Sequence, residues 1–175
     1  MLGILLFIVS EVMLFGAFFA ALFFDRVVAN SGPWPPEGFE LPVEIAAVNT
    51  LILLSSSFTM HYALHSIKHN RRLGMKVGLT ATFLLGATFL ASQVREYFKA
   101  GFAIHDNAFG STFYGLTGLH GAHVFVGLTL LAFAAVRAYR GHFSDKAHRG
   151  VEVAGIYWHF VDVMWIIVFT TVYVL

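Results

Sequence analysis

The sequence places eight ionisable side chains inside long apolar segments, where they are its candidates for chemistry. These side chains are Glu11, His61, His65, Glu96, His120, His123, His159 and Asp162. An ionisable group in a lipid bilayer costs about 2.5 to 3.5 kcal/mol, so such groups face other helices, pair with one another, or mark a functional path. Two pairs, His120 with His123 and His159 with Asp162, are spaced three residues apart. On a helix, this spacing places both members of a pair on one face.

The depth of these residues in their segments divides them into two groups. The inner group contains His61, His65, His159 and Asp162, with Glu11 within reach, and the outer group contains Glu96, His120 and His123. Each group holds a carboxylate and imidazoles, so the favoured interpretation is hydrogen bonding between helices. This interpretation pairs Asp162 with an inner histidine, and Glu96 with His120 or His123.

Two other chemistries use the same residue types. Imidazole pairs on facing helices at equal depth can hold haem iron, and His120 with His123 could chelate a divalent ion. A single pair at this spacing is a weak metal signal, so we expect no metal site in this chain. A ladder of carboxylates and histidines could instead relay protons, but apolar sequence separates the two groups.

Glu11 is the most unusual of these positions, because its neighbours from Ile8 to Phe15 offer no cation or amide. A charged carboxylate is penalised in an apolar environment. One interpretation is therefore a neutral carboxyl group that is hydrogen-bonded to a carbonyl or to a facing histidine. The other is a carboxyl group that gates or buffers protons beside a lipid or partner-subunit surface. The residues leave both interpretations open.

The composition identifies the environment in which these groups lie. Of 175 residues, 58% are hydrophobic and 12% are charged, against about 25% charged residues in an ordinary soluble domain. Eleven Lys and Arg against ten Asp and Glu give no basic face for nucleic acid. The absence of cysteine excludes disulfides and thiolate metal sites. The sequence therefore predicts an integral membrane protein.

Five segments are long enough to cross a bilayer, whose hydrocarbon core of about 30 Å requires about 20 apolar residues in a helix. They are residues 2–24, 44–66, 76–96, 113–137 and 151–174. Three prolines and two glycines within 31–38 must turn the chain outside the bilayer. We predict an all-α polytopic membrane protein, in which residues 1–175 form one domain with five transmembrane helices in one bundle.

The distribution of basic residues predicts the orientation. Eight Lys and Arg lie in or beside loops 68–72 and 140–150, against three on the other side of the membrane. Basic residues near span ends stay in the cytoplasm, so we expect the N-terminus inside and the C-terminus outside. The first apolar run is too long to be a cleaved signal peptide. Small residues at Gly115, Gly118 and Gly121 predict a flat face on the fourth span that permits close helix approach.

Several segments resemble subunit III of the haem-copper terminal oxidases, in the order of that family. They read LFIVSEVMLF at 6–15, REY at 95–97, GSTF at 110–113, TGLHGAHV at 117–124 and YWHFVDVMW at 157–165. The resemblance covers essentially the whole chain. It implies an accessory subunit of a proton-pumping cytochrome c or quinol oxidase in aerobic respiration, in the bacterial cytoplasmic membrane. Such a subunit has no redox centre or catalytic residue of its own.

The resemblance also implies roles and partners. Subunit I and other oxidase subunits would pack against this chain, with haem and copper in the catalytic partners and bound phospholipid around it. The chain would sustain proton uptake, protect the active site during turnover and offer dioxygen lipid-lined access. Glu11 is carried over as functional, and Glu96, His120, His123, His159 and Asp162 as matched family positions with mainly structural roles. His61 and His65 are expected to form structural polar pairs as well. The long family form has seven spans, and this sequence matches from the third onward.

Two alternatives to the oxidase interpretation remain. Short relatives with five spans also accompany nitric oxide reductases, so the partner complex could differ. A chain that stands alone as a dihaem membrane anchor would use His61 or His65 with His159 on the inner side, and His120 or His123 on the outer side.

Overall fold

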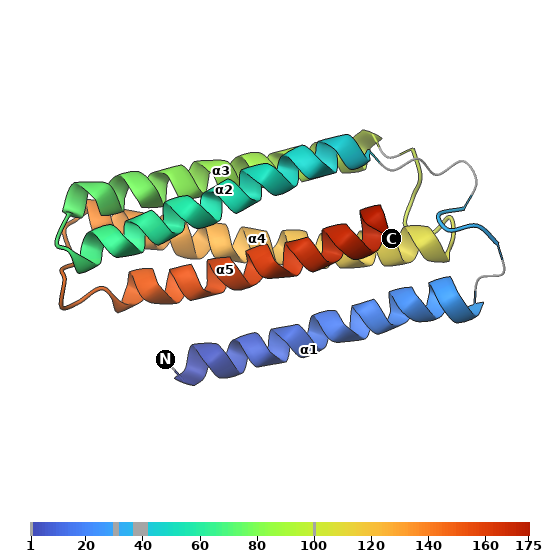
Figure 1. Ribbon diagram of the computed structural model, residues 1–175, viewed down its shortest axis with the longest axis horizontal. Coiled ribbons are helices and arrows are strands. Elements are labelled where there is room, and N and C mark those ends of the chain that lie inside the picture. Colours follow the sequence, from blue (N-terminus) through green and yellow to red (C-terminus); the bar gives the residue numbers. More distant parts are fainter. Residues whose placement is uncertain (1, 30–31, 37–41, 100) are drawn as a thin grey trace.

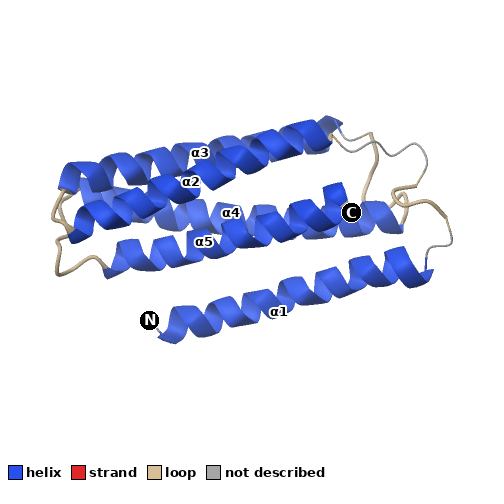
Figure 2. Ribbon diagram, viewed as in Figure 1, coloured by secondary structure: helices blue, strands red, loops and turns tan. Residues whose placement is uncertain are grey.

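The computed structural model describes residues 2–29, 32–36, 42–99 and 101–175. Within these ranges, the chain forms five helices long and apolar enough to cross a membrane, and it forms no strand (Figure 1; Figure 2). The helices are α1 (Leu2–Phe24), α2 (Val43–Lys68), α3 (Arg72–Lys99), α4 (Ala108–Tyr139) and α5 (Arg149–Phe169). Two π-helical turns, η1 (Asp25–Ala29) and η2 (Thr170–Val174), continue α1 and α5. The predicted all-α fold with five apolar helices is confirmed.

The helix boundaries show where local capping decides the start of a helix. α1 spans residues 2–24, as predicted, whereas α4 begins at Ala108 instead of residue 113. Asn107 caps α4, because its side-chain oxygen accepts a hydrogen bond from the backbone N–H of Gly110 at 2.7 Å. Residues 31, 37 and 38 of the predicted proline-rich loop lie outside the described residues.

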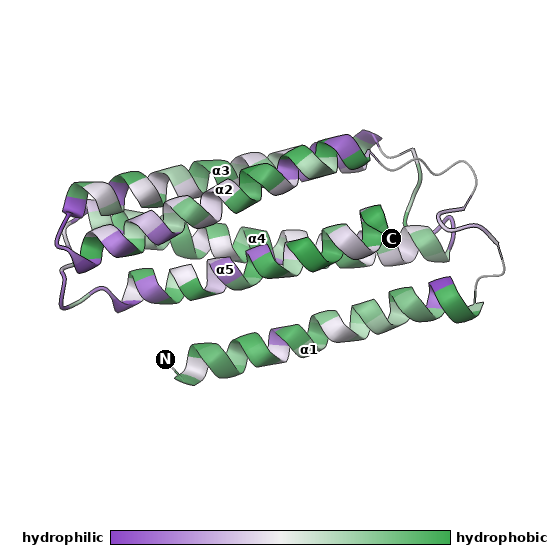
Figure 3. Ribbon diagram, in the orientation of Figure 1, coloured by the Kyte–Doolittle hydropathy of each residue, from purple (hydrophilic) through white to green (hydrophobic). Residues whose placement is uncertain are grey.

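Helices α2 to α5 pack against one another, and α1 lies along one side of them (Figure 1). α2 and α4 each contact both α3 and α5, while α1 contacts α4 and α5. The turns between α2 and α3 and between α4 and α5 lie at the end where α1 begins (Figure 1). Figure 3 shows hydrophilic residues gathered toward the helix ends and hydrophobic residues along most of the helix lengths.

Two buried tryptophans on α5 join this helix to α2. The indole N–H of Trp158 donates a hydrogen bond to the hydroxyl of Ser56, with 2.9 Å between nitrogen and oxygen. The indole N–H of Trp165 does the same with the hydroxyl of Thr50, also at 2.9 Å. A buried indole N–H has no water to bond in a bilayer, so each tryptophan depends on its hydroxyl partner.

The closest helix approach is not at the predicted glycine face. A Cβ atom added at Gly118 would meet nothing within 4 Å, and one at Gly121 would meet only the side chain of Leu90, at 3.9 Å. At Gly78 on α3, an added Cβ would lie 2.9 Å from both the Cα and the backbone nitrogen of Ala63 on α2. At Gly115 an added Cβ would lie 3.3 Å from the ring of Phe18 on α1, so the prediction for the fourth span holds there. It was wrong at Gly118 and Gly121, because glycine spacing alone does not reveal which helix is the neighbour.

We expect Gly78→Ala to destabilise the protein and Gly118→Ala to leave it unchanged or more stable. Alanine in a helix interior gains about 0.5 to 1 kcal/mol over glycine at both positions. At Gly78 the new methyl group overlaps backbone atoms, and overpacking costs about 1 to 3 kcal/mol. The check is the thermal unfolding midpoint of both variants in lipid nanodiscs. Equal midpoints for the two variants would contradict close α2–α3 packing.

Candidate functional site

Glu11 and His123 form a hydrogen-bonded pair that joins α1 to α4. The carboxyl oxygen Oε2 of Glu11 lies 2.7 Å from Nε2 of His123, and both side chains are largely buried. The other ring nitrogen of His123, Nδ1, lies 2.8 Å from the backbone carbonyl oxygen of Leu119. One interpretation of Glu11 was a carboxyl group hydrogen-bonded to a carbonyl or to a facing histidine. In the structure, His123 is this facing histidine.

The geometry of this pair defines its proton content. The carbonyl oxygen of Leu119 can only accept a hydrogen bond, so Nδ1 of His123 must carry a proton. One further proton then lies between Glu11 and Nε2 of His123, in either of two states. It belongs to a neutral carboxylic acid that donates to the imidazole, or to an imidazolium that donates to the carboxylate. The arrangement can therefore hold one exchangeable proton between two buried side chains.

Aromatic rings enclose the pair at the seam of α1, α4 and α5. The ring of Phe15, which is fully buried, lies 5.0 Å from the imidazole of His123, and the ring of Phe160 lies 6.3 Å from it. The hydroxyl of Tyr157 donates to the backbone carbonyl of His123 at 3.4 Å. Among the described residues, Glu11 is the hydrogen-bond partner of Nε2, so the proton is shared within the pair.

The predicted depth groups separated Glu11 from His123, and the structure corrects this. Glu11 was expected within reach of the inner residues and His123 among the outer ones. His123 lies midway along α4, which runs from Ala108 to Tyr139, and there it meets the middle of α1. The expected bond from Glu96 to His120 or His123 is absent from the described part of the chain. Both nitrogens of His123 are already used.

His120 lies fully buried in the core, packed against two aromatic rings. Its ring centroid is 4.8 Å from that of Trp165 and 5.8 Å from that of Phe89. Neither of its ring nitrogens has a hydrogen-bond partner within the residues that the structure describes. Glu96 is half-buried near the end of α3 and forms no ion pair there, again among the described residues.

A second polar cluster joins α2 to α5, with a serine at its centre. The hydroxyl of Ser57 donates to Oδ2 of Asp162. The hydroxyl oxygen of Ser57 also lies 3.2 Å from Nδ1 of His159. Because the hydroxyl proton points to Asp162, this oxygen accepts a hydrogen bond from Nδ1 of His159. Asp162 was expected to pair directly with a histidine, and Ser57 instead stands between them. The run of serines at 55–57 was the sequence signal for this partner.

The remaining predicted residues lie toward the end of α2. His61 and His65 are exposed, and the ring of His65 lies 4.2 Å from that of His69. Across the described ranges, no three His, Asp or Glu side chains gather as a candidate metal site.

The Ser57–Asp162 contact predicts non-additive effects of mutation. Asp162→Ala removes the acceptor of a hydroxyl that has no water to bond, and we expect a loss of about 0.6 to 2 kcal/mol with poorer assembly. Ser57→Ala should produce a similar loss, and the double variant should lose little more than either single variant. The check is a double-mutant cycle on thermal unfolding midpoints. Strictly additive losses would show that the two side chains do not interact.

Comparison with known proteins shows the family of this chain. The chain matches the family model described as cytochrome c oxidase subunit III over residues 1–175. It is 45% identical to cytochrome c oxidase subunit 3 of Thermostichus vulcanus, over 99% of this chain and 86% of that protein. It is 45% identical to subunit 3 of Arabidopsis thaliana and 41% identical to that of Mus musculus, over 98% of this chain and 66% and 67% of those proteins. The chain thus spans about two thirds of the plant and mouse relatives, and it belongs to the cytochrome c oxidase subunit III family.

Proposed function

We propose that this chain is an accessory subunit III of a proton-pumping haem-copper terminal oxidase in aerobic respiration. The observation that carries the proposal is the family match over residues 1–175. Residues 1–175 act as one transmembrane unit without a redox centre or catalytic residue. Haem and copper belong to the catalytic subunits beside it. The catalytic subunits carry out the reaction, and this chain stabilises subunit I, which is one of them.

The Glu11–His123 pair supports a role in proton uptake. The pair holds one exchangeable proton in a largely buried site, 2.7 Å from atom to atom. This proton can pass between the carboxyl group and the imidazole with no change in the net charge of the pair, so neither state leaves an isolated charge in lipid. Of the other residues predicted to be structural, His159 and Asp162 hold α5 to α2 through Ser57, and His120 packs against Trp165 and Phe89. Among the described residues, His61, His65 and Glu96 form no hydrogen bond or ion pair between helices through their side chains.

The outer surface of α1 supports contact with another subunit or with lipid. Of its residues, Phe15 and Leu22 are buried, whereas Leu6 and Met13 are 62% and 72% exposed. Apolar surface of this extent must be covered by subunit I, by other oxidase subunits or by phospholipid. Lipid around the chain would also give dioxygen an apolar route. The complex lies in the bacterial cytoplasmic membrane, with the N-terminus of this chain inside.

Purification of a tagged chain from native membranes tests the proposed complex. We expect a haem-copper catalytic subunit to copurify with it, together with oxygen-consuming activity. Copurification of a nitric oxide reductase would show that this chain belongs to that related complex instead of an oxidase. A haem absorption band in proportion to this chain alone would instead favour the dihaem anchor. Absence of any haem-copper subunit would contradict the proposal.

Glu11→Gln tests the proton role while it preserves the shape of the side chain. We expect normal assembly, because the amide can still donate a hydrogen bond to Nε2 of His123. The exchangeable proton is lost, so proton uptake should slow or activity should decay sooner during turnover. The measurement is oxygen consumption and its decay in the purified complex. Glu96→Gln, outside the pair, is the matched control. Unchanged kinetics in Glu11→Gln would rule out the proton role.

A further inference from the structure

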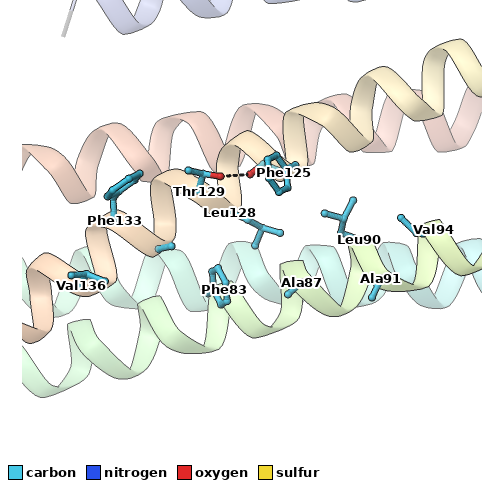
Figure 4. Close-up of a pocket in the computed structure, with 11 residues that line it drawn as sticks. Phe83, Ala87, Leu90, Ala91, Val94, Phe125, Leu128, Thr129, Phe133 and Val136 are labelled. Carbon is cyan, nitrogen blue, oxygen red and sulfur yellow. Dashed lines mark hydrogen bonds between the residues drawn. The ribbon is translucent and has the colours of Figure 1, made fainter.

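An apolar groove runs along the outer surface between α3 and α4. Its volume is about 770 Å³, with Phe83, Leu90 and Val94 on the α3 wall and Phe125, Leu128 and Phe133 on the α4 wall (Figure 4). The polar side chain among its lining residues is Thr129, whose hydroxyl donates to the backbone carbonyl of Phe125 at 2.9 Å. The walls therefore offer hydrocarbon contact and no free hydrogen-bonding group.

The length of the groove corresponds to one leaflet of a bilayer. Phe83 and Val94 mark its extent along α3, and the eleven steps between these two residues, at 1.5 Å each, span about 16 Å. The hydrocarbon core of a bilayer is about 30 Å thick, so the groove covers about half of it. A transmembrane helix of a partner would need the full thickness. An acyl chain that belongs to one leaflet needs only this half.

One end of the groove adjoins a second hollow, whose walls are mostly apolar and carry two hydroxyl groups and one guanidinium group. This hollow, of about 400 Å³, shares Phe83 and Val136 with the groove and adds Thr80, Tyr139 and Arg140. The hydroxyls of Thr80 and Tyr139 lie 3.1 Å apart. Whichever of the two donates within this contact, the other keeps a hydrogen for a further acceptor.

Two cations lie at this end of the groove with no acidic partner among the described residues. The ammonium group of Lys76 lies over the ring of Tyr139, 5.3 Å from its centroid. Within the described residues, neither Lys76 nor Arg140 forms an ion pair, whereas Lys68 lies 4.0 Å from Glu152. The two cations lie at the end where the basic loops gather, at the level expected for lipid headgroups. Their charge complements a phosphate.

We propose that this groove binds an acyl chain of an anionic phospholipid whose phosphate is held by Lys76 and Arg140. The Thr80–Tyr139 hydroxyl pair supplies a further hydrogen bond to a phosphate oxygen. The site belongs to this chain alone and lies between α3 and α4, whereas the Glu11–His123 pair joins α1 to α4. The test of the lipid site therefore succeeds or fails independently of the proposed proton role and of the proposed partner complex.

Native mass spectrometry of the full chain, released from nanodiscs, tests the headgroup site. The nanodiscs contain phosphatidylglycerol or phosphatidylcholine with identical acyl chains. We expect the chain to retain phosphatidylglycerol preferentially, and Lys76→Gln with Arg140→Gln to weaken this retention about fivefold per cation removed. Arg71→Gln removes a positive charge at the same end outside the hollow, and it should retain the lipid as the unmodified chain does.

The acyl-chain site has its own pair of variants. Ala87→Trp fills the groove (Figure 4) and should abolish the preferential retention. Leu84→Trp, at a position 59% exposed and outside the groove, should have no effect.

Four results would overturn the proposal. The first is equal retention of phosphatidylglycerol and phosphatidylcholine, and the second is an equal loss of lipid retention in Arg71→Gln and in the variant that changes Lys76 and Arg140. The third is displacement of the lipid by inorganic phosphate, and the fourth is unchanged lipid retention in Ala87→Trp. A photoreactive residue at Ala91 adds a direct test in the native membrane. Capture of lipid there supports the proposal, whereas capture of a protein would make the groove a subunit interface.

Discussion

The hydrogen bond between Glu11 and His123 fixes α1 against α4 in the middle of the apolar region. Helices in a bilayer gain little from burying apolar surface, because lipid tails are equally apolar. α1 buries few of its own side chains, so its position depends strongly on polar contacts that lipid cannot replace. The same bond carries the proton on which the proposed role in proton uptake rests. Position and chemistry thus depend on one contact.

The same constraint shapes the rest of the bundle. Trp158 and Trp165 each find a hydroxyl acceptor on α2, and Asp162 accepts from Ser57 on that helix. Each of these contacts satisfies a polar group that would otherwise face hydrocarbon. Where two helix backbones approach closely, as at Gly78 against Ala63, the residue is a glycine and no Cβ atom blocks the approach. The core therefore combines apolar packing with small residues at close approaches and with polar pairs between helices.

The sequence predicted the helices better than their contacts. Hydropathy and length define a membrane span locally, so α1 was predicted at its observed limits. The start of α4 was missed because it depends on one cap, Asn107. Pairings such as Glu11 with His123 depend on which helices are neighbours, and spacing within a helix carries no such information. The motifs around these residues did predict the family, because they are long and occur in the family order.

A cryo-EM map of the complex purified from native membranes tests the central claim most directly. The claim is that α1 is held by a carboxyl–imidazole pair within a subunit of a haem-copper oxidase. The predicted result shows this chain against a haem-copper catalytic subunit, with the Glu11 carboxyl group within hydrogen-bond distance of Nε2 of His123. A map in which Glu11 faces away from His123, or in which no haem-copper subunit accompanies the chain, would contradict it.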